Sequence, residues 1–207
     1  MTFGSRLANA ARAYLAADDR SAADDSWYRP LEGAGFSASD KLSALRQATV
    51  WACIRVISED IAASPCMVFK RGAGNRKDVA INHPLYSILH DAPNSEITAF
   101  EFWELIIASM MLWGNAFCRY VTNGRGEILE LVPLAPAMVE VKRDRDTGMK
   151  FYEIRDSRGQ VRLEFDDTIL HFPGLSLDGL RGLSPVDYHD RTLATGAASE
   201  QFAKSFF

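Results

Sequence analysis

The segment of residues 98–117, TAFEFWELIIASMMLWGNAF, decides the fold, because it specifies where a long helix begins and ends. Thr98 and Glu101 have the T-x-x-E spacing of a capping box, in which the two side chains bond backbone N–H groups at a helix start. Gly114 suits the left-handed conformation that ends a helix. The large apolar residues between them leave only a narrow strip at Glu101, Glu104 and Ala108, so we expect this helix to form a domain core or a subunit interface.

Downstream of this helix, short β-prone runs alternate with turn residues. The turn Asn123-Gly-Arg-Gly126 is typical of a hairpin. We expect strands at residues 116–122, 127–132, 139–143, 149–155, 160–165 and 168–172. This pattern predicts an antiparallel β meander with the helices packed on one face, which is an α+β fold.

Upstream of residues 98–117, the sequence predicts a further long helix at residues 43–64. Its apolar side chains recur at helical spacing, at Trp51, Ile54, Ile57 and Ile61. Between residues 50 and 57 almost every position except Arg55 is apolar, so we expect this helix to be covered on most sides.

The stretch between the two long helices predicts a short strand at residues 66–70 and a short helix. Four basic residues, Lys70, Arg71, Arg76 and Lys77, flank a Gly-Asn turn, and we interpret them as a solvated hairpin tip rather than as a binding patch. His83-Pro84 opens the short helix, and Asp91-Ala-Pro-Asn94 ends it.

The two ends of the chain differ from its middle. Residues 1–42 are rich in Ala, Ser, Asp and Gly, which predicts a mobile N-terminal arm that becomes ordered only against a neighbour. Ser184 and Pro185 are an N-cap and a first helical residue, so a last helix should begin there. No cap follows it, and we expect the chain to be part of a longer protein. The predicted units are the arm 1–42, an α+β domain 43–183 and the helix 184–207.

The composition restricts the class of protein. The 207 residues are 47% hydrophobic and 24% charged, which is typical of a globular fold. The 23 Lys and Arg residues against 27 Asp and Glu give a net charge of −4, which argues against binding nucleic acid through a net positive field. Cys53, Cys66 and Cys118 lack zinc-site spacing, so we expect reduced core thiols of a cytosolic protein.

The sequence offers no catalytic constellation. The four histidines have no H-x-x-x-H spacing, and the serine-elbow, phosphate-loop and dinucleotide motifs are missing. Asp166, Asp167 and His171 could be imagined as a metal site, but adjacent carboxylates in an extended segment point to opposite sides. We therefore expect neither an enzyme nor a metal or cofactor site.

Five stretches in this order suggest a family: ATVWACIRVISEDIAASPCMVF, NHPLYSILHDAPN, TAFEFWELIIASMMLWGNAF, GEILELVPLAPAMVEV and DTILHFPGLSLDGLRGLSPV. From about residue 49 to residue 207 the chain resembles tailed-phage portal proteins, in the branch found in long-tailed phages, prophages and gene transfer agents. Family members are about twice as long, and residues 1–48 carry no usable resemblance.

The resemblance implies a ring of about twelve subunits at one capsid vertex, through which double-stranded DNA passes without sequence-specific contacts. It implies as partners further copies of the chain, the terminase large subunit, a head–tail connector and the major capsid protein. It implies a virion protein without catalytic residues, assembled in the cytoplasm of a bacterial host. A net acidic conduit agrees with this function, because each phosphate contact would add salt-dependent affinity and slow the DNA.

Under this resemblance the α+β domain is the peripheral wing of the ring, and the last helix leads to its stem. The expected roles are rigid brackets at Pro93 and Asn94, core packing at Trp103 and Trp113, a helix-to-strand corner at Gly114 and Asn115, a wing-to-stem turn at Gly182, Ser184 and Pro185, and a subunit contact along Ala194, Ala197, Ala198 and Phe202.

Alternatives remain open at the level of the sequence. The ridge of small residues on the last helix could pack on its own subunit rather than on a neighbour. The whole chain could be an interaction or adaptor module that forms no ring, or a small hydrolase of an unrecognised type.

Overall fold

The computed structural model describes residues 41, 44–45, 47–72, 74, 76–156 and 159–204. In chain order the elements are α3 (Ala48–Ala62), β1 (Phe69–Arg71), β2 (Lys77–Val79), α4 (Pro84–His90), α5 (Ala99–Trp113), β3 (Asn115–Thr122), β4 (Ile128–Leu134), the short 3-10 helix η3 (Pro136–Met138), β5 (Val139–Arg143), β6 (Lys150–Arg155), β7 (Val161–Phe165), β8 (Ile169–Pro173), α6 (Pro185–Tyr188) and α7 (Asp190–Lys204). The predicted α+β class is confirmed. The predicted N-terminal arm lies, except for Lys41, outside the described residues.

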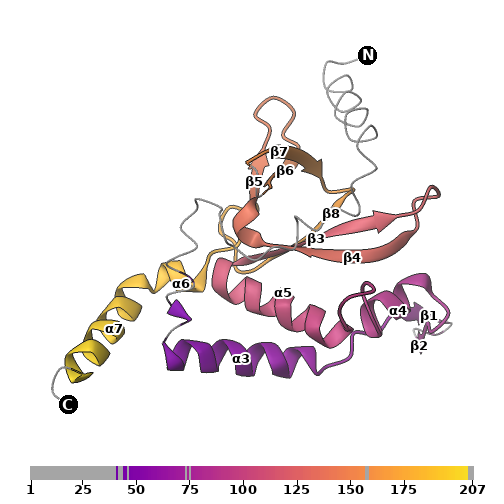
Figure 1. Ribbon diagram of the computed structural model, residues 1–207. Helices are drawn as coiled ribbons and strands as arrows, with labels where there is room; N and C mark the ends of the chain where they lie inside the picture. Colours follow the sequence, from indigo (N-terminus) through magenta and orange to yellow (C-terminus); the bar gives the residue numbers. More distant parts are fainter. Residues whose placement is uncertain are drawn as a thin grey trace.

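The strands after α5 form two three-stranded sheets, so the prediction of a single meander was wrong. One sheet has the order β4-β3-β8, and the other has the order β5-β6-β7. All pairings are antiparallel, and β8 returns to β3 with Phe117 opposite His171. In Figure 1 the β5-β6-β7 sheet stands above the β3-β4 hairpin, with α5 on the opposite side of that hairpin. The turn residues mark where strands end, but they do not encode which distant strand pairs with which.

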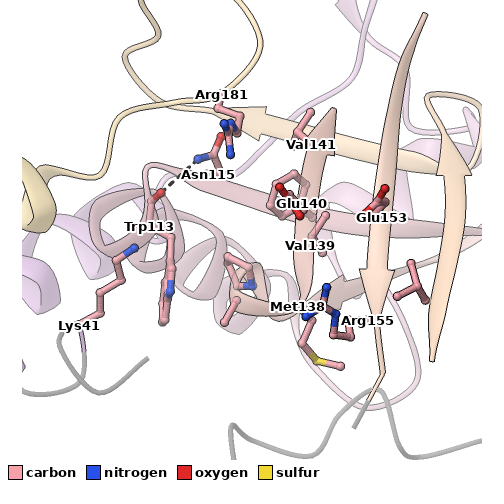
Figure 2. A pocket seen from close by; sticks show the side chains of 14 residues that line it. Lys41, Trp113, Asn115, Met138, Val139, Glu140, Val141, Glu153, Arg155 and Arg181 are labelled. Atoms are coloured by element: carbon pink, nitrogen blue, oxygen red, sulfur yellow. Dashed lines mark hydrogen bonds between the residues drawn. The ribbon is translucent and has the colours of Figure 1, made fainter. Parts of the chain in front are cut away.

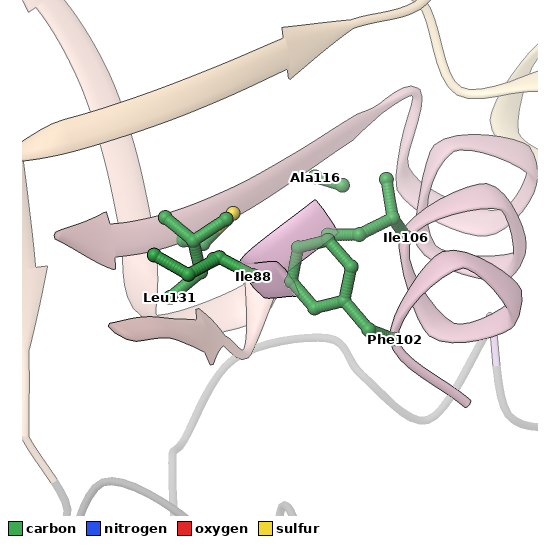
Figure 3. Packing of buried hydrophobic residues seen from close by; sticks show 6 residues of the cluster. Ile88, Phe102, Ile106, Ala116 and Leu131 are labelled. Atoms are coloured by element: carbon green, nitrogen blue, oxygen red, sulfur yellow. The ribbon is translucent and has the colours of Figure 1, made fainter. Parts of the chain in front are cut away.

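Helix α5 is positioned as the sequence predicts. The capping box of Thr98 and Glu101 is complete, and Gly114 ends the helix with φ 73°. The buried side of α5 packs on the β4-β3-β8 sheet, where it forms a core cluster with α4 (Figure 3). The members of this cluster are Ile88, Phe102, Ile106, Ala116, Cys118 and Leu131. Each large apolar side chain buried there stabilises the fold by roughly 1.5–3 kcal/mol.

A second core cluster fills the space between the two sheets. It contains Phe117, Leu134, Val141, Tyr152, Ile154 and Ile169. Because Phe117 and Cys118 are successive residues of β3, their side chains point to opposite faces of that strand and reach different clusters. Strand β3 is therefore buried on both faces.

Helix α3 lies along α5 on the side away from the sheets (Figure 1). It begins at Ala48 and not at residue 43, because the backbone at Gln47 is extended. Its buried residues, Ile54, Ser58 and Ala62, form a single narrow line.

The expectation that α3 is covered on most sides was wrong for the described chain. Trp51 is 54% exposed, Ile57 42% and Ile61 47%. Cys53 is exposed as well, so the prediction of three core thiols holds only for Cys118, which is buried and whose pKa burial raises to about 12. An apolar pattern predicts that a helix side is covered, but it does not say by which molecule.

The predicted last helix is interrupted. Ser184 and Pro185 start α6 as expected, but that helix ends at Tyr188, and α7 begins after His189, whose φ and ψ are −108° and 16°. On α7, Ala194 and Ala198 are exposed. Phe202 is 67% exposed, and the side chain of Ala197 lies outside the described part.

The β1–β2 hairpin carries the four basic residues of the sequence pattern. The first strand runs over Phe69–Arg71 rather than over residues 66–70, and it pairs with Lys77–Val79. Arg76 forms an ion pair with Asp78 at 2.8 Å, and the basic side chains are exposed. Within the described residues, no helix is both long and apolar enough to cross a membrane.

Candidate functional site

Four predicted site residues from two distant stretches of the chain meet in space. Gly114 and Asn115 join α5 to β3, whereas Gly182 and Ser184 lead from β8 into α6. All four residues are buried. We call this group the junction; it connects the α+β domain to the C-terminal helices.

Two backbone segments touch at the junction, and each has a glycine at the point of contact. A Cβ atom on Gly182 would overlap the carbonyl oxygen of Gly114. A Cβ atom on Gly114 would overlap the backbone of Leu183, and its positive φ also favours glycine. The Gly114 carbonyl accepts a hydrogen bond from the N–H of Gly174 at 2.8 Å. No side chain separates the end of α5 from the segment that enters α6.

The Asn115 side chain pairs with the backbone N–H and C=O of Gly182 through two hydrogen bonds. Its Nδ2 donates to the Gly182 oxygen at 2.9 Å, and its Oδ1 accepts from the Gly182 nitrogen at 2.8 Å. Nδ2 also donates to the oxygen of Trp113 at 3.1 Å (Figure 2). Because these groups are buried, losing any of them would leave a polar group without compensation.

Ser184 has two roles, of which the sequence predicts one. Its Oγ accepts from the N–H of Asp187 at 3.1 Å, which is the expected N-cap of α6. The same hydroxyl donates to the oxygen of Leu112 at 2.7 Å, in the last turn of α5. The start of α6 is therefore attached directly to the end of α5. Sequence reasoning missed this second contact, because nothing local to Ser184 encodes it.

The loop before α6 is held by an aspartate. Asp178 Oδ1 accepts from the N–H groups of Leu180 and Arg181 and from the Ser176 hydroxyl. These hydrogen bonds lower the pKa of the carboxyl to about 2. The same loop presents Leu177, which is 82% exposed, so the loop has a fixed shape and an apolar tip.

Pro93 and Asn94 form a separate bracket. Asn94 Nδ2 donates to the oxygen of Leu131 at 2.9 Å, and the nitrogen of Leu131 donates to the oxygen of Pro93 at 2.8 Å. Asn94 Oδ1 also accepts from the backbone N–H groups of Glu96 and Ile97. The segment between α4 and α5 is thereby fixed to β4, but it does not reach the junction.

The expectation that both tryptophans fill the core was only partly right. Trp103 is half-buried; its ring packs edge-on against Phe172, and its Nε1 donates to the oxygen of Leu89 at 3.1 Å. Trp113 is also half-buried, and it lies in the wall of a surface cavity. An indole has an apolar body and a polar N–H, so it suits the edge of a core as well as its centre.

This cavity, of about 360 Å³, adjoins the junction (Figure 2). Its wall is apolar at Trp113, Phe117 and Val141. Its charged lining residues are Lys41, Glu140, Glu153, Arg155 and Arg181.

The two glutamates of this cavity share one cation. Lys142 bonds the carboxylates of Glu140 and Glu153 at 3.2 and 2.6 Å. Among the described residues, no group of His, Cys, Asp and Glu side chains could hold a metal ion. The hydrogen bonds of the junction hold the end of α5 and the start of α6 in a fixed relation.

Comparison with known proteins places the chain in a family. The family model described as phage portal protein matches residues 48–207. The portal protein of Enterobacteria phage HK97 is 31% identical over 183 residues, which are 86% of this chain and 42% of that protein. The probable portal protein of Streptomyces phage phiC31 is 27% identical and covers 79% of this chain and 37% of that protein. The chain thus spans less than half the length of these two relatives.

Solved structures agree on the fold. A chain in the neck of an empty GTA particle superposes with a TM-score of 0.68 and 23% identity, over 80% of this chain and 46% of that chain. A chain of the virion of the native gene transfer agent particle gives a TM-score of 0.63 and 20% identity, over 80% of this chain and 44% of that chain. The family model covers most of the described residues, including the junction. The chain belongs to the phage portal protein family.

Proposed function

We propose that this chain is the wing and the beginning of the stem of a portal subunit. About twelve copies form a ring at one capsid vertex, and double-stranded DNA is packaged and ejected through its centre. In this proposal residues 1–42 form an arm, residues 43–183 form the wing, and residues 184–207 lead toward the stem. The family match over residues 48–207 supports this assignment.

The observation that carries the proposal is the apolar side of α3 that the described residues leave uncovered. Ile57 and Ile61 lie one turn apart and are 42% and 47% exposed, and Trp51 is 54% exposed. Apolar surface of this kind is typical of a contact with another molecule. In a ring, a second copy of the chain would cover it, because cyclic assemblies join two different surfaces of the same subunit.

The charge and the chemistry of the chain support a passive role. A net charge of −4 opposes strong binding to DNA phosphates, which suits a channel through which DNA must slide. The subunit would act as a structural part of the virion rather than as an enzyme. The terminase large subunit, a head–tail connector and the major capsid protein would be its partners, and assembly would take place in the host cytoplasm.

The test is the mass of the particle formed by the entire protein that the gene encodes. Native mass spectrometry should give a ring of about twelve subunits. The double variant Ile57→Glu and Ile61→Glu should give smaller species while circular dichroism stays unchanged. Leu129→Glu is the matched control, because Leu129 is 54% exposed on β4, and α5 separates that strand from α3 (Figure 1). A monomeric wild-type protein would favour the adaptor module that forms no ring.

A further inference from the structure

His171 on β8 reaches the junction from the side opposite Gly182. Its Nε2 lies 2.9 Å from Oδ1 of Asn115. The imidazole stacks on Phe117 with 4.6 Å between ring centroids, and Tyr152 meets it edge-on at 5.8 Å. From the sequence His171 is an ordinary strand histidine, and the proposed function does not use it.

The protonation of this ring follows from the contacts of its partner. The Gly182 N–H requires an acceptor and the Gly182 carbonyl requires a donor, so the Asn115 amide has only one compatible orientation. In that orientation the atom facing His171 is Oδ1, which carries no hydrogen. The hydrogen of the neutral imidazole therefore resides on Nε2 and is donated to Asn115.

With this contact every hydrogen-bond donor and acceptor position of the Asn115 amide has a partner. Its two donors go to the oxygens of Trp113 and Gly182, and its two acceptor positions go to Gly182 N–H and His171 Nε2–H. An amide rotated by half a turn would place its NH₂ against the N–H of Gly182 and its oxygen against the Gly182 carbonyl. In the observed orientation the Nε2–H of His171 adds a second hydrogen bond to Oδ1 and so restrains the position of the amide.

We propose that His171 is a positioning residue that holds the Asn115 amide in register with the Gly182 peptide. Through this contact it sets the direction in which the chain leaves β8 for α6. Any effect of this direction on ring assembly rests on the proposed function, whereas the hydrogen bond between His171 and Asn115 does not. A histidine that only filled space beside Phe117 would leave the Asn115–Gly182 pairing unchanged when replaced.

The experiment measures hydrogen exchange at the Gly182 amide, by NMR or by mass spectrometry, in the entire protein. In His171→Leu this amide should exchange about tenfold faster or more, because its acceptor is no longer fixed. In His171→Gln, whose side-chain Nε2 can donate to the same oxygen, the wild-type rate should be kept within about twofold. Amides of the β3–β8 ladder serve as the internal control and should stay protected in both variants.

Two results would overturn the proposal: an unchanged Gly182 rate in His171→Leu, or an equal acceleration in His171→Gln. If His171→Leu fails to fold, His171→Phe keeps an aromatic ring beside Phe117 and takes its place. On an Asn115→Ala background, His171→Leu should change the Gly182 rate no further, because the intermediary is gone.

Ring mass is recorded on the same samples and separates the two proposals. A wild-type protein without rings, whose Gly182 amide still responds to His171→Leu, would refute the ring and retain the positioning role. Wild-type rings with an unresponsive Gly182 amide would do the reverse.

Discussion

Arg119 on β3 and Glu164 on β7 form an ion pair that joins the two sheets. The glutamate side chain is 6% exposed and the arginine side chain 24%. Apolar side chains of the second core cluster, such as Tyr152 and Ile169, also lie between the sheets. The pair therefore adds an orientation-dependent contact to packing that has little directionality.

Removing the carboxylate of this pair should destabilise the fold. We expect Glu164→Ala to lower the free energy of unfolding by about 2–4 kcal/mol, because a largely buried guanidinium loses its counter-charge. Urea denaturation measures the change. Glu140→Ala, which removes a 46% exposed carboxylate from Lys142, is the control and should cost less than about 1 kcal/mol. Similar losses in the two variants would show that burial of the pair does not matter.

A methyl group at Gly182 should break the junction. Gly182→Ala places a Cβ where the Gly114 carbonyl oxygen lies, and neither backbone can move without losing hydrogen bonds. We expect a loss of about 3 kcal/mol or more, measured by chemical denaturation. Gly124→Ala is the matched control, since its Cβ would meet nothing within 4 Å. That variant should stay within about 1 kcal/mol of the wild type, and an equally mild Gly182→Ala would contradict the close approach.

Trp103 should contribute through both its ring and its N–H group. Trp103→Ala removes the packing on Phe172 and the hydrogen bond to Leu89, so we expect a cost of about 3 kcal/mol in thermal or urea unfolding. Trp51→Ala should cost less than about 1 kcal/mol in the isolated chain, because Trp51 is 54% exposed. A loss below about 1 kcal/mol for Trp103→Ala would refute its place in the core.

The fold should lose stability in mildly acidic solution. The pKa of His171 is lowered to about 4, chiefly by burial and also by the charge of Lys150, whereas Asp166 opposes both effects. The unfolded chain binds this proton near pH 6.5, so the stability from the neutral ring is complete above that pH and declines as the pH falls toward 4.

Thermal melts at pH 6.5 and pH 5 test this linkage. The midpoint Tm of the wild type should fall between these two values, and that of His171→Gln should fall less, because the proton-binding group is gone. The lowered pKa of Asp178, about 2, acts only at lower pH and does not interfere. Equal falls in the two proteins would show that another group titrates.

The exposed ridge residues Ala194, Ala198 and Phe202 of α7 should serve assembly rather than folding. We expect Ala198→Arg to weaken ring formation by the entire protein, because a small residue that allows close helix approach is replaced by a long charged one. Residues 43–172 should remain folded by circular dichroism. Thr192→Arg, on the opposite side of α7, is the control for native mass spectrometry. Normal rings from Ala198→Arg would remove this ridge from the subunit contact.

The sequence predictions that were correct rest on local signals. The capping box at Thr98, the left-handed Gly114 and the N-cap Ser184 each act within one helical turn, so the sequence around them suffices. The hairpin Asn123–Gly126 is local for the same reason. Two of these residues, Gly114 and Ser184, belong to the junction.

Contacts between residues that are distant in sequence could not be predicted in this way. The pairing of β8 with β3 and the bond from Ser184 to Leu112 depend on residues that are distant in sequence. The break at His189 has neither glycine nor proline to mark it. His171 gave no signal at all, because its role depends on Asn115, whose amide orientation follows from Gly182.

The return of β8 to β3 also affects the order in which the strands can pair. Strands β5, β6 and β7 are neighbours in sequence and can pair as they leave the ribosome, as can β3 and β4. The second edge of β3 must wait until residue 173 has been synthesised. Until then one edge of β3 presents unpaired N–H and C=O groups, which is the kind of edge that recruits strands from other chains. A nascent chain interrupted before Ile169 would therefore keep an unpaired strand edge that can bind other chains. The pairing of β8 with β3 covers this edge.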